Sequence, residues 1–341
     1  MNTDISDLEK LTWSKEKAIE WYAQQPWLVG CNYIPSNAIN QLEMFQAETF
    51  DSDQIDKELG WARSIGFNLL RIYLHYLLWE QDASGLKKRM KNLLEICEKH
   101  QMKVLFVFFD DCWVQDPKIG KQPEPIPGVH NSGWAASPGS KRVVDKSIWP
   151  MLKQYVQEIL TEFSQDNRIL GWDLYNEPGN EGMLEKSLPL LIETYRWARE
   201  INPSQPLTVG IWNQRKVSVK IFEEFNRIQS TLSDFISFHN YSNFRSLKRQ
   251  ISKLKKHGRP IICTEYMGRP RSLFETHLPV FKEANVGCIN WGLVAGKTQT
   301  IFPWGSEEGG PEPEVLFHDI FHPDGTPYLQ KEVDFIRDIT K

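Results

Sequence analysis

The stretch ILGWDLYNEP, residues 169–178, is an apolar and aromatic run that breaks off into an amide, a carboxylate and a proline. A short run that is nearly continuous in hydrophobicity is typical of a parallel strand covered on both faces. Pro178 lacks the N–H that a strand needs, so we expect the strand to end before it. Asn176 and Glu177 then lie at the carboxyl end of a buried strand.

Seven further runs of this kind occur along the chain, separated by amphipathic stretches. The eight runs are residues 27–33, 67–74, 103–109, 169–175, 207–212, 235–241, 260–266 and 286–293. A helical stripe is clear at 149–163, where apolar residues recur at three- and four-residue spacing. The alternation predicts an α/β fold, a (β/α)8 TIM barrel. A doubly wound open sheet is the competitor, but no Gly-rich phosphate loop follows the first run.

The chain is predicted to form one barrel domain over residues 1–341, with a short helical extension at about residues 1–25. No linker or change of composition divides it. Two long connections, 110–145 and 293–327, are rich in Pro, Gly and Trp and follow the third and eighth runs. Loops of this length in a compact domain usually carry function, so we expect both at the rim of the site.

The composition excludes several classes of partner. The net charge of −4 argues against nucleic acid and anionic membrane surfaces, and no apolar run is long enough to span a bilayer. The polar N-terminal stretch contains no secretory signal, so a cytoplasmic location is expected, or a secreted or periplasmic one if a signal was removed. The five cysteines are predicted to be buried thiols rather than disulfides. Oligomeric state is left open.

Polar, ionisable and aromatic residues recur at the ends of the predicted strands, where barrel enzymes carry their chemistry. A barrel core does not need them, because a buried polar group costs about 1–3 kcal/mol unless it is paired. Their concentration at one rim therefore predicts a site. They include Arg71, Asp110, Asp111, Trp113, Asn176, Glu177, Trp212, Asn213, His239, Tyr241, Glu265 and Trp291.

Two of these residues, Glu177 and Glu265, belong to the fourth and seventh runs, so their side chains can face each other across the barrel mouth. A pair of carboxyl groups suits the cleavage of a glycosidic bond. One group protonates the departing oxygen while the other, ionised, attacks the anomeric carbon. We expect Arg71 beside Glu265 to keep that group charged, and Asn176 to bind the sugar hydroxyl next to the reacting carbon.

Together these residues resemble glycoside hydrolase family 5, the cellulase family, or a neighbouring family of the same clan of retaining barrel glycosidases. The resemblance extends over most of the chain as strand order, and its specific part is a set of short motifs. These are Arg71, the Asn-Glu-Pro at 176–178, the His-x-Tyr of His239 and Tyr241, Glu265 in CTEY, and Trp291.

The resemblance implies roles for four of these residues. Glu177 would be the acid/base and Glu265 the nucleophile. Tyr241 would hydrogen-bond the nucleophile, and Trp291 would form an apolar floor for the sugar. The family usually carries a histidine after the third strand, but this chain reads FFDDCW there. Asp110 or Asp111 is predicted to replace that histidine in binding substrate, and an ion pair with a basic neighbour is the alternative.

Other aromatic and histidine residues have weaker assignments. Four tryptophans are open between stacking on sugar rings and packing within loops: Trp113, Trp134, Trp212 and Trp304. His318 and His322 lie four residues apart in HDIFH, but Pro323 follows directly and no HExxH is present. We therefore predict two ordinary loop histidines and no metal site.

The resulting prediction is a retaining β-glycoside hydrolase that needs no cofactor and acts on a β-linked oligo- or polysaccharide such as glucan, mannan or xylan. Its two carboxyl groups would lie about 5–5.5 Å apart. Two alternatives stay open, a transglycosidase on the same scaffold and a catalytically silent barrel that only binds saccharide. Sugar identity and endo or exo action are not predicted.

Overall fold

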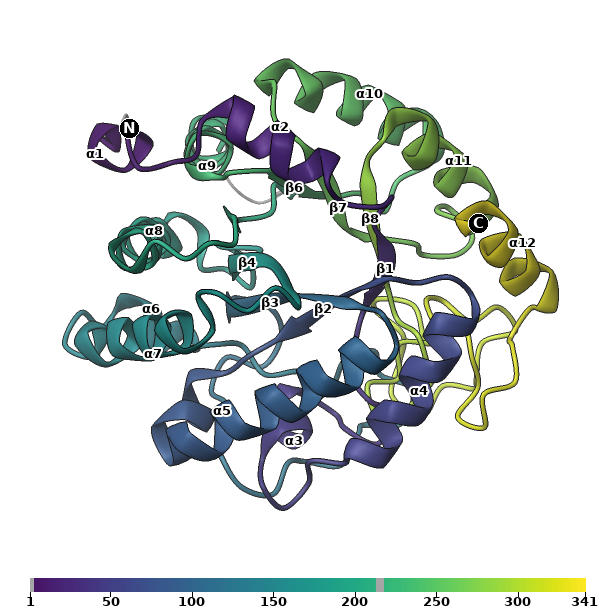
Figure 1. The fold of residues 1–341 in the computed structure, drawn as a ribbon. Helices are drawn as coiled ribbons and strands as arrows, with labels where there is room; N and C mark the ends of the chain where they lie inside the picture. Colours follow the sequence, from purple (N-terminus) through teal and green to yellow (C-terminus); the bar gives the residue numbers. More distant parts are fainter. Residues whose placement is uncertain (1–2, 213–217) are drawn as a thin grey trace.

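The computed structural model describes residues 3–212 and 218–341, and within them eight parallel strands form one sheet. The strands lie in the order β5-β4-β3-β2-β1-β8-β7-β6, and helices surround them (Figure 1). Each strand overlaps one of the predicted runs, which confirms the (β/α)8 barrel. The strands are β1 (Val29–Asn32), β2 (Leu69–Tyr73), β3 (Lys103–Asp110), β4 (Ile169–Asn176), β5 (Leu207–Thr208), β6 (Ile236–His239), β7 (Ile261–Tyr266) and β8 (Gly287–Trp291).

Helices alternate with the strands and cover the outside of the sheet (Figure 1). The helical stripe predicted at 149–163 is α7, and its regularly spaced apolar residues are buried. The helices are α1 (Ser6–Glu9), α2 (Lys15–Ala23), α3 (Gln41–Phe45), α4 (Ser52–Ser64), α5 (Tyr76–Lys99), α6 (Ser140–Val144), α7 (Trp149–Phe163), α8 (Leu188–Ile201), α9 (Val219–Leu232), α10 (Phe244–Leu254), α11 (Phe274–Ala284) and α12 (Gln330–Thr340), with 3-10 turns at Leu184–Ser187 and Lys255–His257.

The sheet closes between β5 and β6, where the regular ladder is interrupted. Ile211 makes an isolated parallel bridge to Phe238. Its N–H donates to the carbonyl of Ser237 at 2.8 Å, and its carbonyl accepts from the N–H of His239 at 2.9 Å. β5 is shorter than the predicted run, and side-chain hydroxyls bond the backbone next to it: Oγ1 of Thr208 donates to the carbonyl of Phe235 at 2.9 Å, and Oγ of Ser233 accepts from the N–H of Val209 at 3.2 Å.

The barrel interior is apolar at the amino-terminal ends of the strands and polar above that level. A layer of buried side chains fills the lower end, and α2 covers it, with Trp21 stacked on Phe235 at 5.5 Å between ring centroids. Above this layer, Arg71 and Asp173 are fully buried and form an ion pair at 2.8 Å. Burying charged groups costs free energy even when they are paired. This polar layer therefore indicates a function, and it lies directly below the site at the carboxyl ends of the strands.

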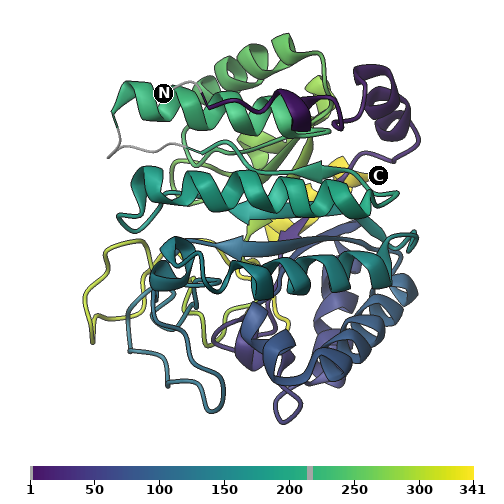
Figure 2. The same cartoon turned by 90° about the vertical axis from the view of Figure 1, so that its left-hand side faces the viewer.

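The two long connections predicted to carry function lie together at the carboxyl ends of the strands. Residues 110–145 follow β3 and include α6, and residues 293–327 follow β8. Figure 2 shows them extending side by side from the lower left of the barrel. The backbone N–H of Asn131 donates to the carbonyl of Thr298 at 2.8 Å, so the two connections are bonded to each other.

Two predictions made from composition concern the state of the cysteines and the absence of a membrane-spanning run. All five cysteines are free and buried, as predicted. Over residues 3–212 and 218–341, no helix combines the length and hydrophobicity that crossing a membrane requires.

Candidate active site

Glu177 follows the last residue of β4 in a backbone conformation that L-residues rarely adopt. Its φ angle is +42°, in the left-handed region, which costs a non-glycine residue of order 1 kcal/mol or more. Asn176 before it still belongs to the strand, and Pro178 follows it. The unfavourable backbone angle turns the side chain out of the strand, and the carboxylate lines the large cleft at the barrel mouth.

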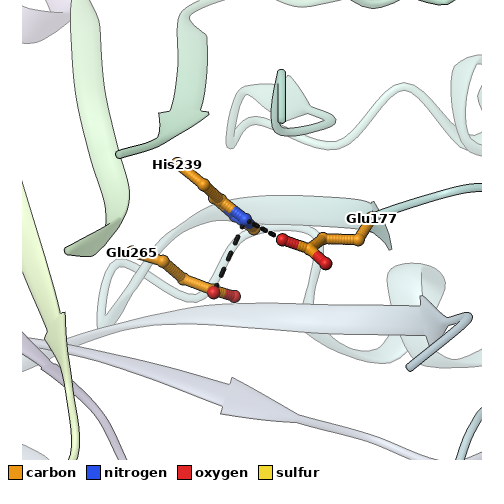
Figure 3. A group of neighbouring side chains, drawn as sticks. All are labelled: Glu177, His239 and Glu265. Atoms are coloured by element: carbon orange, nitrogen blue, oxygen red, sulfur yellow. Dashed lines mark hydrogen bonds and ion pairs between the residues drawn. The ribbon is translucent and has the colours of Figure 1, made fainter. Parts of the chain in front are cut away.

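Glu177 and Glu265 meet at this mouth with His239 between them (Figure 3). One carboxylate oxygen of each glutamate and one ring nitrogen of the histidine all lie within 4.8 Å of one another. Nδ1 of His239 is 2.7 Å from Oε1 of Glu177 and 3.5 Å from Oε2 of Glu265. Burial lowers the pKa of His239, but the negative charges of Glu265 and Glu177 outweigh it and raise the pKa above its usual value.

Arg71 from β2 lies directly beneath this pair and is fully buried. Its Nη1 donates to Oε1 of Glu265 at 2.9 Å, as expected from the sequence. Its Nη2 donates to Oδ2 of Asp173 and to Oδ1 of Asn176, both at 2.8 Å. The guanidinium therefore fixes three side chains of the site at once, through the planar fork geometry that arginine provides.

Glu265 receives two further donors from tyrosines. The hydroxyl of Tyr241 donates to Oε2 at 2.9 Å, which is the contact the family resemblance implied. The hydroxyl of Tyr73 donates to Oε1 at 3.1 Å. Three donors to one carboxylate hold its oxygens in place and suit a group that attacks as an anion.

Glu177 has different neighbours, and its side chain is more exposed than that of Glu265, 15% against 7%. Besides His239, Oε2 accepts from Nδ2 of Asn180 at 2.7 Å and contacts Sγ of Cys112 at 3.5 Å. No arginine or lysine pairs with it among the residues that the structure describes. Glu177 therefore contacts a histidine that can itself exchange a proton, whereas Glu265 contacts the permanently charged guanidinium of Arg71.

The ligand atoms of Glu177, His239 and Glu265 are close enough to hold a metal ion. However, both oxygens of Glu265 already accept hydrogen bonds, and the charge of Arg71 lies 2.9 Å away. That positive charge would oppose a bound cation. The cluster therefore suits acid–base and nucleophilic chemistry better than the binding of a cation.

The cleft above the pair has a volume of about 2000 Å³. Predicted site residues that line it are Trp113, Asn176, Glu177, Trp212, His239, Tyr241, Glu265 and Trp291. Trp291 packs edge-to-face on Trp134 and on Tyr73, with ring centroids 5.4 Å and 5.9 Å apart, so its ring is held by two neighbours. Nε1 of Trp212 donates to the carbonyl of Pro178 at 3.3 Å. Asn213 lies outside the described residues.

The family model for Cellulase (glycosyl hydrolase family 5) matches residues 37–296, more than half of the chain. The chain belongs to glycoside hydrolase family 5. The resemblance inferred from the motifs is thereby confirmed, and the protein is a glycoside hydrolase. No curated protein matches the sequence.

Solved structures with the same fold are distant in sequence. GH5_18 from Streptomyces cattleya, in complex with Manβ1-4GlcNAc, has a TM-score of 0.64 and 10% identity, over 93% of this chain and 80% of that one. The exo-β-1,4-mannosidase Op5Man5 from Opitutaceae bacterium strain TAV5 has a TM-score of 0.62 and 17% identity, over 92% of this chain and 59% of that one. An endo-β-1,4-mannanase from Thermotoga petrophila has a TM-score of 0.57 and 14% identity, over 94% and 77%.

Asp110 and Asp111, predicted to stand in for the family 5 histidine, lie beneath the cleft rather than along it. Oδ1 of Asp110 accepts from Nδ2 of Asn176 at 2.9 Å, and Oδ2 accepts from Nε1 of Trp134 at 2.7 Å. Asp111 accepts from the hydroxyl of Tyr175 at 2.7 Å. Their direct contact with substrate stays a prediction, and neither forms the alternative ion pair within the described residues.

Asp111 is buried and has no cationic partner among the described residues, so the free energy of unfolding should depend on pH through this group. Burial raises its pKa from 3.8 to about 7, against the lowering effect of hydrogen bonds from Ser187, Tyr175 and Gly179. A carboxyl group whose pKa rises on folding stabilises the fold at low pH, and that contribution is lost as the pH rises through the folded value. The sensitive window therefore runs from about pH 4 to pH 7.

We expect the stability advantage of the wild type over Asp111→Asn to shrink by roughly 4 kcal/mol between pH 4 and pH 8, because each pKa unit corresponds to about 1.4 kcal/mol. Urea unfolding of both proteins at a series of pH values measures this difference. Parallel pH dependences of the two proteins would show that Asp111 keeps an ordinary pKa in the folded state.

Several residues of the site were not found from the sequence. Cys112 and Asn180 contact Glu177, and Tyr73 and Asp173 complete the surroundings of Arg71. Cys112 follows the two aspartates directly and, unlike them, lines the cleft. Asp173 and Tyr73 point into the barrel from positions that alternation along β4 and β2 could have identified, whereas Asn180 and Cys112 lie in loops with no such signal.

Proposed function

We propose that this family 5 enzyme is a retaining β-glycosidase, with Glu265 as nucleophile, Glu177 as acid/base and a β-linked mannoside as its first candidate substrate. The observation that carries the proposal is the approach of the two carboxylates, which have oxygens within 4.8 Å. Retaining enzymes hold the two groups about 5–5.5 Å apart, whereas inverting enzymes leave about 6.5–9.5 Å for a water molecule.

The proposed reaction has two displacements. First, an oxygen of Glu265 bonds to the anomeric carbon while the bond to the leaving oxygen breaks, and that oxygen takes the proton of Glu177. Then water gives a proton to Glu177, and its oxygen replaces Glu265 at the anomeric carbon. The guanidinium and tyrosine donors on Glu265, and the contacts of Glu177 with His239 and Asn180 in place of an arginine, support this division of roles.

Asn176 supports the transition state in this proposal. Its Oδ1 accepts from Nη2 of Arg71 at 2.8 Å, which fixes the orientation of the amide, and its Nδ2 carries the two N–H donors. One N–H donates to Asp110, and the other contacts only Sγ of Cys112 at 3.5 Å, a weak acceptor. That second N–H can donate to the sugar hydroxyl beside the anomeric carbon, where a hydrogen bond strengthens as positive charge develops.

The choice of a mannoside rests on the similar structures. Those compared above include an exo-β-1,4-mannosidase, an endo-β-1,4-mannanase and a protein crystallised with Manβ1-4GlcNAc. Trp291 lines the cleft and is held edge-to-face by Trp134 and Tyr73, so its ring offers an apolar face that suits a flat, C–H-rich sugar face. Glucosides and xylosides are the alternatives to be compared.

The test combines a substrate screen with the stereochemistry of the product. We expect turnover of a 4-nitrophenyl β-glycoside, with the mannoside preferred over the glucoside and xyloside. Proton NMR during the first minutes should show the β-anomer of the released sugar before mutarotation produces the α-anomer. An α-anomer as first product would establish inversion, and no turnover of any glycoside would favour a barrel that only binds saccharide. Products extended by an added acceptor sugar would identify a transglycosidase.

A further inference from the structure

One end of the catalytic cleft is closed by the two long connections. Five residues from them line the cleft at this end and are called the cleft wall here: His130, Asn131, Trp134, Trp304 and His318. Nδ1 of His130 contacts the carbonyl of Phe302 at 2.7 Å, and the N–H of Asn131 donates to Thr298 at 2.8 Å. These contacts join the connection after β3 to the connection after β8.

The cleft wall is tightly packed. Trp134 is only 3% exposed and lies edge-to-face against Tyr73 at 5.0 Å. The ring centroids of His130 and His318 lie 5.3 Å apart, and those of Trp304 and Tyr241 lie 4.8 Å apart. Four members of the wall are therefore held by ring contacts, and the backbone of Asn131 is held by its hydrogen bond to Thr298.

Behind the cleft wall there is no room for a second sugar. The space there is a pocket of about 20 Å³ between β1, β2 and β8, lined by Asn32, Tyr73, Trp134 and Trp291 among others. Such a volume holds about one water molecule. On the other side, the cleft continues from Glu177 past Trp212 toward Asn243 and Gln250. Among residues 3–212 and 218–341, the cleft is therefore closed at one end and open at the other.

The positions of the catalytic carboxylates decide which part of the substrate meets the closed end. Glu177 must reach the glycosidic oxygen, so the leaving group lies on the side of Glu177 and continues into the open part of the cleft. With the roles proposed above, the transferred sugar would lie over Glu265 and Trp291, against the cleft wall. A chain extending beyond that sugar would collide with Trp134 and Asn131.

Two members of the cleft wall carry buried acceptors that lack a protein partner, Oδ1 of Asn131 and Nε2 of His318. Asn131 is 2% exposed and His318 is not exposed. Nδ1 of His318 faces the carbonyl of Met267, so it carries the proton and leaves Nε2 as an acceptor. Burial lowers the pKa of His318 well below its usual value, which keeps the ring neutral. An unpaired buried acceptor is unfavourable until a donor reaches it.

We infer that the enzyme is exo-acting and that its closed cleft end binds one non-reducing terminal sugar, whose remote hydroxyls donate to Oδ1 of Asn131 and Nε2 of His318. The inference rests on the proposed function, since the orientation of substrate follows from the roles of Glu177 and Glu265. It adds that the substrate class is oligosaccharides or glycoconjugates with a terminal β-linked sugar, whereas the leaving group can be long.

The first experiment compares mannotetraose labelled at its reducing end with the same compound capped at its non-reducing end by a 4,6-benzylidene acetal. We expect mannose as the first product from the free tetraose, and a kcat/KM at least about 100-fold lower for the capped one, because a polar site rejects a ligand that cannot pair with it. If the aryl glucoside is the better substrate in the screen, the gluco-series is used instead.

Substitutions in the cleft wall test the two acceptors. His318→Asn keeps a donor for the Met267 carbonyl and removes the Nε2 acceptor, so kcat/KM for the free tetraose should fall about 10- to 100-fold. His322→Asn is the matched control, because His322 lies on the same connection but does not line the cleft. Trp304→Ala, at a side chain that is 49% exposed, should narrow the difference between capped and free tetraose at least about tenfold by opening the wall.

The outcomes separate this inference from the proposed function. Turnover of the aryl β-glycoside together with equal cleavage of both tetraoses, or mannobiose as the first product, would overturn exo action and leave the glycosidase intact. Equal effects of His318→Asn and His322→Asn would remove His318 from substrate binding. Failure to cleave every aryl glycoside and tetraose would overturn both proposals.

Discussion

Changing Glu265 to alanine is expected to reduce kcat for an aryl β-glycoside by about 10⁴- to 10⁶-fold, because the proposed first displacement then lacks its nucleophile. The same change leaves the sugar bound, so KM should change far less than kcat. Steady-state kinetics with 4-nitrophenyl β-glycosides measure both constants. Glu283→Ala, an exposed glutamate on α11, is the control and should retain wild-type kinetics.

Azide distinguishes the roles of the two carboxylates in the same experiment. In Glu265→Ala, azide can occupy the vacated space and attack the anomeric carbon from that face, which gives an α-glycosyl azide. In Glu177→Ala, Glu265 still forms the glycosyl-enzyme with a good leaving group, and azide then gives the β-product. Identical azide products from both variants, or full activity of Glu265→Ala, would contradict the assignment.

Replacing Arg71 by methionine is expected to lower the free energy of unfolding by about 3–5 kcal/mol, the usual cost of breaking a buried ion pair from one side. Arg71 is fully buried between Asp173 and Glu265, at 2.8 and 2.9 Å. Without it, the carboxylates of Asp173 and Glu265 stay in the barrel interior without their guanidinium partner. Activity of the folded protein should fall with stability, because Glu265 also loses the donor that fixes its position. Urea unfolding and kinetics below the unfolding transition measure the two effects.

A second buried ion pair provides the control for this prediction. Arg199 pairs with Asp234 at 2.7 Å, with side-chain exposures of 3% and 0%, but lies away from the cleft. Arg199→Met should therefore lose a similar free energy of unfolding while its folded fraction keeps the kcat of the wild type. An Arg71→Met protein as stable and active as the wild type would show that the polar layer does not depend on the guanidinium.

The barrel was predictable because its signals are local. A strand covered on both faces must be apolar along its length, and the run at 169–175 meets that requirement just as 103–109 does. The burial of β4 over all its residues confirms this interpretation. The exception is β5, which is limited to Leu207–Thr208, and no pattern in residues 207–212 reveals the side-chain hydrogen bonds that surround it.

The central part of the site could also be predicted from the sequence, because the position of a residue along its strand decides whether it reaches the barrel mouth. Residues at the carboxyl ends of barrel strands converge, so Glu177, His239 and Glu265 were expected to meet, and the structure places them together. The residues that surround this central part could not be predicted from the sequence. Asn180 approaches Glu177 through a turn, and His318, predicted to be an ordinary loop histidine, lines the cleft because of the path of residues 293–327.

The sequence by itself determined the strand order and placed Glu177, His239 and Glu265 at the barrel mouth, since periodicity and strand ends are properties of short stretches. Only the tertiary structure decided that the cleft is closed at one end, because that depends on hydrogen bonds such as that between Asn131 and Thr298, which are far apart in the chain. Loop backbones take their course from such long-range contacts rather than from local preference, so their paths appear only when the whole chain is folded.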